Sequence, residues 1–454
     1  MKDYFTINIP EGCLKVMNTL KNNGYRAYIV GGCVRDSIIG IDPHDWDICT
    51  NCKPDNMMEV FKEFNVIPTG LKHGTITVMV NNVGYEVTTF RIDGEYSDSR
   101  HPDEVTFTND LTEDLSRRDF TMNSIAYSPD EGYIDCYGGM EDIKNKKIVT
   151  VGNPLDRFNE DPLRILRAFR FSAQLGFEIE SDTLSGIKTL CNKLGAVSKE
   201  RIREEFNKIL IYNPKVLVDL FNNYLLRRII CFNEYYFTMD QNNPYHHLNL
   251  FDHTVLATTI IEPELHLRLT MLLHDIGKIK TRVNDANGIS HYYNHAEESA
   301  RMANIILHDL KYDNDTIDKV ITLIKAHDYQ IDSKKIIKRR LNKMGIKLTK
   351  DLLKVKYADI MAQNPLYAKD RLIKLFEAKQ MICEIEANKE CFDRKHLNIN
   401  GNDLISLGLK GKMIGRVLDN ILEKIMNEEL VNDRDMLLKY SRVKYEEIVN
   451  NERK

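Results

Sequence analysis

The sequence predicts an α+β domain at the N-terminus, followed by a remainder that is all α-helical. Up to about residue 140, helical patterns alternate with strand-like runs at 27–30, 74–80 and 85–90. From about residue 141 onward strand signals nearly vanish. Apolar residues then recur at the spacing of amphipathic helices, as in segments 160–175, 199–211, 296–310 and 414–426.

The length of 454 residues suggests three or four units of roughly 100 to 200 residues each. Pro244 separates a hydrophobic, helix-like stretch from a histidine-rich one, so we place a boundary near residue 245. The expected division is a head (1–140), a helical neck (141–244), a third helical domain (245–365) and a helical tail (366–454).

Composition narrows the class of protein. The chain is 43% hydrophobic and 29% charged, and it has no apolar run of about 18 residues, so we expect no membrane association. The first residues lack the apolar core of a secretory signal, and nine scattered cysteines suit free thiols, which indicates a cytoplasmic protein. Cys49 and Cys52 are interpreted as two small semi-buried thiols. The net charge of −4 argues weakly against nucleic acid as a partner, so local clusters must decide that question.

A glycine pair and an arginine follow the first strand-like run, in the motif Val-Gly-Gly-Cys-Val-Arg-Asp at 30–36. Gly31 and Gly32 allow the backbone to approach a phosphate chain, and Arg35 supplies a fixed cation. This stretch therefore predicts a site for a nucleoside triphosphate.

Two carboxylates, Asp45 and Asp47, follow at a spacing that points both to one side of a strand, with Trp46 between them. They form a hard oxygen site suited to Mg²⁺. Glu86 lies in the next strong strand pattern and is either a third catalytic acid or a cross-strand partner for a basic side chain.

The segment 160–171 predicts a helix that reads a base. Asp161 is followed at intervals of three by Arg164, Arg167 and Arg170, and Pro162 fits the first helical turn. Cytosine and adenine both offer an amino donor beside a ring-nitrogen acceptor. A carboxylate accepts from that amino group and an arginine donates to that ring nitrogen, so Asp161 with Arg164 favours CTP and ATP over UTP and GTP.

Four motifs, taken in order along the chain, resemble those of a known family. They are the glycine motif at 31–36, the acidic pair, Arg-Arg-Asp-Phe-Thr-Met-Asn at 117–123 and Glu-Asp-Pro-Leu-Arg at 160–164. They look like the successive motifs of class II tRNA nucleotidyltransferases, the CCA-adding enzymes of bacteria. The resemblance is dense over the first 215 residues and looser beyond. It implies a polymerase-β-like nucleotidyltransferase head that adds CCA to tRNA from CTP and ATP with release of pyrophosphate. It also implies nucleotide contacts by Arg118, Asn123, Arg167 and Arg170.

Related activities remain as alternatives. Bacterial poly(A) polymerases share much of this motif set, but residues 69–77 match the tRNA-specific enzymes better. An enzyme that adds only CC or only A is a further alternative. The polar segment 91–105 predicts a mobile loop, and in the resembled family such a loop accompanies complete CCA addition.

A second candidate site lies in the third domain, whose histidines and acids resemble the signature of HD phosphohydrolases: His253, His274, Asp275, His295 and Asp359. These side chains could hold one or two transition-type metal ions. The last ligand stays open, because His327 and Asp328 are also available. The alternative function of another class is therefore a metal-dependent phosphohydrolase acting on nucleotides or RNA ends, and a non-enzymatic RNA-binding protein is more distant.

The tail predicts a phosphate contact. Gly408 and Gly411, with Lys410 and Lys412, precede an apolar pattern of helical spacing that starts at Ile414. Backbone N–H groups and lysines at a helix start suit phosphate, so we expect a tRNA backbone contact there.

Overall fold

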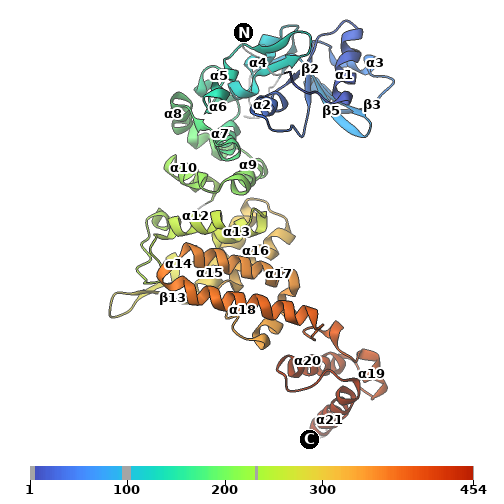
Figure 1. Cartoon of the computed structure of the whole chain (residues 1–454), viewed down its shortest axis with the longest axis vertical. Coiled ribbons are helices and arrows are strands. Elements are labelled where there is room, and N and C mark those ends of the chain that lie inside the picture. Colours follow the sequence, from blue (N-terminus) through green and yellow to red (C-terminus); the bar gives the residue numbers. More distant parts are fainter. Residues whose placement is uncertain (1–5, 95–103, 231–233, 453–454) are drawn as a thin grey trace. The chain divides into compact units, whose positions relative to one another are not determined.

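The computed structural model describes residues 6–94, 104–230 and 234–452. Its chain divides into two compact units, Met1–Cys231 and Phe232–Lys454, coloured blue to green and green to red in Figure 1. The finer division into four domains stays a prediction.

A mixed sheet forms the centre of the first unit, and its described strands follow the order β3-β4-β5-β2-β1-β8-β9. Within it β2 and β5 run parallel, whereas the other neighbours are antiparallel. The strands are β1 (Ala27–Val30), β2 (Asp47–Thr50), β3 (Asn65–Gly70), β4 (Thr75–Val80), β5 (Val83–Thr89), β8 (Ile125–Ser128) and β9 (Gly132–Asp135).

Helices and short turns surround this sheet. Two of them, α1 (Glu11–Asn22) and α2 (Gly32–Ile39), contact β1, whose four side chains are all buried. Tyr28 stacks on Phe90 within the core beneath. The remaining elements of this region are α3 (Pro54–Val60), η1 (Leu71–His73), α4 (Leu111–Ser116), η2 (Thr121–Asn123) and α5 (Gly139–Lys144).

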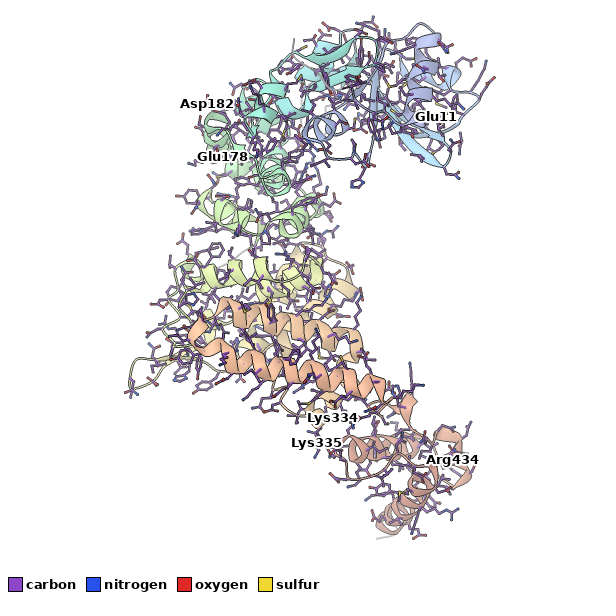
Figure 2. The ribbon with its side chains drawn as sticks, in the orientation of Figure 1. Glu11, Glu178, Asp182, Lys334, Lys335 and Arg434 are labelled. Atoms are coloured by element: carbon purple, nitrogen blue, oxygen red, sulfur yellow. The ribbon has the colours of Figure 1, made fainter. Side chains whose placement is uncertain are left out.

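From residue 136 onward, the described part of the first unit is helical apart from one short parallel pair, β10 (Lys147–Ile148) with β11 (Glu178–Ile179). Glu178 in this pair and Asp182 in the next helix are labelled in Figure 2. The core of this part forms where α7 packs on α9. Its helices are α6 (Pro154–Glu160), α7 (Leu163–Leu175), α8 (Ser181–Leu190), η3 (Cys191–Ala196), α9 (Lys199–Tyr212), α10 (Val216–Asn222) and α11 (Leu226–Ile229).

The described part of the second unit is helical except for the hairpin of β12 (Arg282–Asn284) and β13 (Ser290–Tyr292). Its first helices are η4 (Glu234–Phe237), α12 (Leu250–Ile260), α13 (Leu265–Leu273), α14 (Lys278–Thr281), α15 (His295–Asp309) and α16 (Asn314–Ala326). Two long helices follow, α17 (Lys334–Ala362) and α18 (Ala368–Ala387), and they pack along each other (Figure 1).

The last helices of the second unit share a separate apolar core around Leu404, Ile421 and Leu437. Arg434, labelled in Figure 2, begins the final helix and forms an ion pair with Asp403. The elements from here to the end are η5 (Pro365–Tyr367), η6 (Arg394–His396), α19 (Gly401–Ser406), α20 (Lys412–Met426) and α21 (Arg434–Glu452).

The α+β head and helical remainder predicted from the sequence are confirmed. One detail differs, because the polar segment 91–105 starts and ends in paired strands, β6 (Arg91–Asp93) and β7 (Val105–Phe107). The middle of that predicted loop, 95–103, lies outside the described residues. Cys49 and Cys52 are free thiols and fully buried. Among the described residues, no helix is both long enough and apolar enough to cross a membrane.

Candidate active site and a second candidate metal centre

The acidic pair lies where the two parallel strands of the sheet meet. Asp47 is the first residue of β2, and its register partner on β5 is Glu86. Asp45 precedes the strand, and along this stretch Trp46 and Ile48 are buried while both aspartates are exposed. Neighbours in register on parallel strands point to the same face, so the structure brings Asp47 and Glu86 together.

The charges of this carboxylate group act on one another. Desolvation and the charges of Glu86 and Asp45 together raise the pKa of Asp47 to about 6, and the charge of Arg118 opposes them. A raised carboxyl pKa among like charges marks a place where a cation is favourable. Three carboxylates are also the hard donor set that Mg²⁺ prefers, so the residues present fit that ion.

The glycine motif forms the start of α2 beside these carboxylates. Gly31 has φ 80°, a conformation that favours glycine, and a Cβ there would lie 3.2 Å from Nη1 of Arg118. Glycine therefore leaves room for a guanidinium at the end of the helix where free N–H groups point outward. The side chain of Arg118 is held by Asp114, with 3.1 Å between Nη2 and Oδ2.

Arg35 lies inside the protein, with 5% of its surface exposed. It donates to Asp36 and, at 2.7 Å, to Oδ1 of Asn123, and its guanidinium is 4.9 Å from the ring centre of Phe171. Its Nη2 atom lies 3.8 Å from the place of a Cβ on Gly32. Arg35 therefore places a positive charge beneath the glycine pair and fastens α2 to η2 and α7.

Asp119 connects η2 to α7. One of its oxygens accepts from Asn123 at 3.0 Å, and the other accepts two hydrogen bonds from Arg167 at 2.6 and 2.8 Å. Burial alone raises the pKa of Asp119, but Arg167 and Asn123 outweigh burial and hold it well below its usual value. Our sequence reasoning did not select Asp119. In the sequence, its one signal was an acid that directly follows two arginines and precedes an apolar run.

The two residues predicted to read the base have separate partners. Asp161 caps the start of α7 by accepting from the N–H of Leu163, and its other oxygen accepts from Arg201 at 2.7 Å. Arg164 donates to Glu160 at 2.6 Å and to the backbone oxygen of Arg117 at 3.0 Å. The structure thus holds both groups in place, but with protein partners. Sequence reasoning missed Arg201, since it lies on α9 and no local pattern links it to Asp161.

The other two arginines of α7 differ in exposure. Arg170 is buried, donates to Glu205 at 2.9 Å, and lies 3.4 Å from the ring centre of Phe171. Arg167 is partly exposed and bonded to Asp119. Arg170 therefore joins α7 to α9, whereas part of the Arg167 side chain stays exposed to solvent.

A second group of candidate ligands lies in the second unit, where helices α12, α13, α15, α16 and α17 converge. The distance from His253 Nε2 to Asp359 Oδ1 is 3.2 Å, and that from His274 Nε2 to Asp275 Oδ2 is 3.2 Å. His295 Nε2 lies 3.4 Å from the other oxygen of Asp275. The structure thus brings together all five residues that the sequence singled out in this domain, and it adds His327. Among the described residues, groups of three or more ligand atoms within 4.8 Å of one another all lie in this unit.

Backbone oxygens orient the imidazole rings of this cluster. Nδ1 of each faces a backbone oxygen at 2.6 to 3.1 Å, in the pairs His253 with Ala362, His274 with Met271, His295 with Tyr292 and His327 with Ile324. A carbonyl oxygen only accepts, so Nδ1 carries the hydrogen and Nε2 faces the cluster. Metal-bound histidines are commonly oriented in this way.

Charge in the cluster is distributed unevenly. Burial lowers the pKa of His274, but Asp275 and Asp359 outweigh it and raise that pKa to about 10. Burial lowers the pKa of His327 to about 3. Lys278 also places its ammonium nitrogen 2.7 Å from Oδ2 of Asp275. The two carboxylates thus attract positive charge from several directions.

A pocket of about 940 Å³ opens onto this cluster. Asp359 belongs to the cluster itself, whereas Asp328, the alternative considered for the last ligand, lines the pocket. Lys369, Arg371 and Tyr367 also line it.

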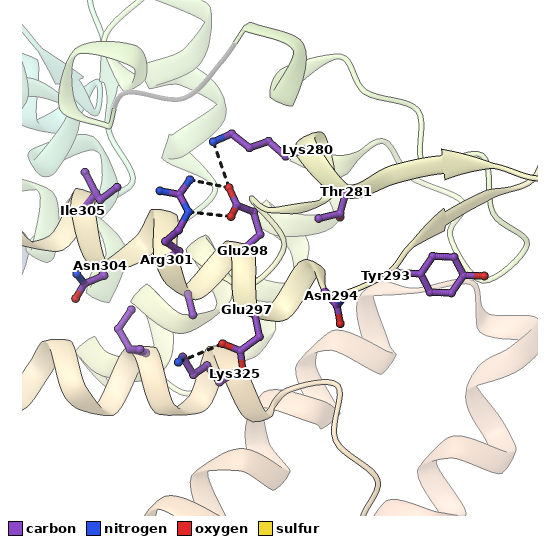
Figure 3. A pocket seen from close by; sticks show the side chains of 12 residues that line it. Lys280, Thr281, Tyr293, Asn294, Glu297, Glu298, Arg301, Asn304, Ile305 and Lys325 are labelled. Carbon is purple, nitrogen blue, oxygen red and sulfur yellow. Dashed lines mark hydrogen bonds and ion pairs between the residues drawn. The ribbon is translucent and has the colours of Figure 1, made fainter.

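A neighbouring pocket of about 1000 Å³ lies beside α15 and is drawn in Figure 3. Its charges pair with one another: Glu298 with Arg301 and Lys280, and Glu297 with Lys325. These internal pairs satisfy the charges that a ligand would otherwise meet.

In the tail, α20 begins at Lys412, directly after Gly411 at φ 54°. The structure therefore places the predicted glycines and lysines at a helix start, and contact with tRNA there stays a prediction.

Comparison with known proteins gives matches along most of the chain. Residues 27–149 match the poly A polymerase head domain, 176–226 a probable RNA and SrmB-binding site of polymerase A, and 289–441 a putative tRNA nucleotidyltransferase domain 2. The CCA-adding enzyme of Oceanobacillus iheyensis is 47% identical over 194 residues, which are 43% of this chain and about half (48%) of that enzyme.

Other relatives align over nearly their whole length. The CCA-adding enzyme of Ligilactobacillus salivarius is 31% identical over 450 residues, covering 97% of this chain and 99% of that enzyme. The crystal structure of the Bacillus stearothermophilus CCA-adding enzyme in complex with CTP is similar with a TM-score of 0.73 at 26% identity, covering 97% of this chain and 98% of that one.

Proposed function

The chain belongs to the family of CCA-adding enzymes, and from this premise we propose that it adds C, C and A to the 3′ end of tRNA, using CTP and ATP and releasing pyrophosphate. The observation that carries the proposal is the register of Asp47 with Glu86 beside Arg118 and the glycine pair. The similar Bacillus stearothermophilus enzyme was solved with CTP, which agrees with a triphosphate at this place. A cytoplasmic location is part of the proposal.

Asp45 and Asp47 would hold Mg²⁺, with Glu86 as the third acid. A bound Mg²⁺ supplies positive charge that offsets the triphosphate and the attacking hydroxyl. The N–H group of Gly32 and the guanidinium of Arg118 would bind phosphate oxygens, and the buried charge of Arg35 lies close to them. The 3′-oxygen of tRNA forms a bond to the α-phosphorus, and the bond from that phosphorus to the β-phosphate oxygen breaks. Most of the rate then comes from positioning and charge.

Base choice would lie with Asp161 and Arg164. Asp161 accepts from the amino group of cytosine or adenine in place of Arg201, and Arg164 donates to the ring nitrogen in place of Glu160. Both side chains enter this exchange already ordered, which reduces the entropy lost on binding.

The experiment is incorporation of labelled CTP into tRNA that lacks its 3′ end. Asp45→Ala should abolish incorporation and leave tRNA binding largely intact, because the variant loses a cation ligand and keeps the predicted phosphate contact of the tail unchanged. Asp130→Ala, which removes an exposed carboxylate of the same domain, should behave as wild type. Appreciable turnover by Asp45→Ala rejects its role.

A second candidate function rests on the histidine cluster. Oriented imidazoles and carboxylates at His253, His274, Asp275 and Asp359 favour a transition-metal site, and lysine and arginine in the adjoining pocket suit a phosphate group. The full-length chain should therefore hydrolyse a 2′,3′-cyclic phosphate at an RNA end when supplied with Mn²⁺, and His274→Ala should not. Equal turnover by the two proteins, or no turnover by either, would reject this function.

A further inference from the structure

Phe171 on α7 lies among three guanidinium groups. Its ring is buried, with 2% of the residue exposed. The guanidinium carbon of Arg170 lies 3.4 Å from the ring centre, that of Arg35 lies 4.9 Å away, and that of Arg167 lies 5.5 Å away. A guanidinium within about 6 Å of a ring centre is attracted by the negative charge of the ring face. One ring therefore meets three cations.

The three arginines reach this ring from different parts of the candidate active site. Arg35 belongs to α2, beneath the glycine pair, and donates to Asn123 on η2. Arg167 and Arg170 belong to α7, which also carries Arg164 of the predicted base reader. The ring thus connects a positive charge beside the proposed triphosphate site with the helix that is proposed to read the base.

Positive charges this close together repel one another. Burial and the charge of Arg167 both lower the pKa of Arg170, although Glu205 opposes them. The faces of an aromatic ring carry negative charge, so the ring reduces this repulsion more than an aliphatic side chain of similar size would. An aromatic residue at position 171 is therefore favoured by its charge distribution as well as by its volume.

A second ring fixes the orientation of Phe171. Phe120, which is fully buried and follows Asp119, meets it edge to face, with 5.7 Å between the ring centres and 85° between the ring planes. This arrangement is favourable for two aromatic rings. The segment 117–123, which also supplies Arg118, therefore sets the orientation of the ring that the three guanidiniums contact.

We propose that Phe171 is a positioning residue for nucleotide addition, a role that rests on the CCA addition proposed above. Its ring holds the three guanidiniums in one arrangement, so that the charge beside the triphosphate and the helix that reads the base keep a fixed separation. Phe171 is buried and acts only through these arginines. A displaced triphosphate or base would move the α-phosphorus away from the attacking 3′-oxygen, and transfer slows steeply with such misplacement.

Fluorination of the ring tests this role, because fluorine withdraws negative charge from the ring face with little change in shape. The full-length chain is made with one, two or three fluorines on the phenylalanine at position 171, and kcat/KM for CTP is measured with tRNA that lacks its 3′ end. We expect kcat/KM to fall at each step, by about tenfold or more in total.

The control is the same series at Phe158, which is fully buried in the same unit. Within the part of the chain that the structure describes, no guanidinium lies over that ring. Fluorination there changes a buried ring without changing a cation contact, so kcat/KM should stay as it is in the unmodified chain.

The outcomes separate this role from nucleotide addition itself. An unchanged kcat/KM along the Phe171 series, or an equal fall along the Phe158 series, overturns the role of Phe171 and leaves CCA addition standing. No incorporation by the unmodified chain rejects CCA addition, and the role of Phe171 with it. If the chain with three fluorines does not fold by circular dichroism, the chains with one and two fluorines still give the trend.

Discussion

At the scale of single residues, Asp119 shows how one buried carboxylate joins two motifs. It accepts hydrogen bonds from Asn123 on η2 and from Arg167 on α7, and Oδ1 of Asn123 in turn accepts one from Arg35 on α2. The nucleotide-binding residues predicted from two separate motifs therefore depend on one acid for their position.

We expect Asp119→Asn to lower the free energy of unfolding at pH 7 by about 1 to 3 kcal/mol, since the partly exposed Arg167 loses the buried anion with which it pairs. The folded-state pKa of Asp119 lies below its usual value. Its contribution is therefore present above the unfolded pKa of about 4 and is lost as pH falls toward the folded pKa. Urea unfolding of both proteins should show a difference at pH 7 that shrinks below about pH 4. Asp130→Asn, at an exposed pair with Lys21, should change stability by less than about 1 kcal/mol. A difference that grows in acid would contradict this account.

Asp161→Ala should relax base choice. Removing the acceptor abolishes the advantage of bases that present an amino group, which is worth about 1 to 3 kcal/mol. The ratio of kcat/KM for CTP to that for UTP should fall about tenfold or more. Arg201→Ala retains the acceptor and should keep the ratio near wild type. Unchanged discrimination in Asp161→Ala would show that another group reads the base.

The sequence predicts site residues where their spacing within one segment carries the chemistry. It does not predict their partners on other segments. The spacing of Asp45 with Asp47, and the alternation with Trp46, can be read from adjacent letters. The ion pair of Asp161 with Arg201 depends on the packing of α7 on α9, which no local pattern encodes.

At the scale of elements, the buried strand 27–30 was predictable because its residues are uniformly apolar, and all four are buried. The hairpin of β12 and β13 was not predictable, because its strands are short and polar and are stabilised by pairing with each other. The long helix α17 also hides a break, where Gly345 adopts φ 76° and ψ 169°.

That break predicts the effect of one substitution. Residues other than glycine seldom adopt such a conformation, so Gly345→Ala should lower the free energy of unfolding by about 1 to 3 kcal/mol although nothing blocks the new Cβ. Gly415→Ala, inside α20 with ordinary φ and an ordinary neighbour distance, should leave stability equal or higher. Chemical denaturation of both variants measures this. Equal stability of the two would mean that α17 straightens at little cost.

At the scale of the whole molecule, contacts between distant motifs assemble the candidate site. Arg164 reaches the backbone of Arg117, and Arg167 reaches Asp119, so segment 160–170 lies against segment 117–123. The order of the motifs could be read from the sequence and pointed to the family. The distances that join these motifs could be learned only from the fold. The same is true of the position of His295 and His327 beside Asp275.

We propose that one chain adds the whole CCA end. The most direct measurement is sequencing of the products after the full-length protein is incubated with tRNA lacking its 3′ end, CTP, ATP and Mg²⁺. We expect products that end in C, C and A, three nucleotides longer than the substrate, with no incorporation of UTP or GTP. A long tail of A, or products that stop after CC, would contradict it.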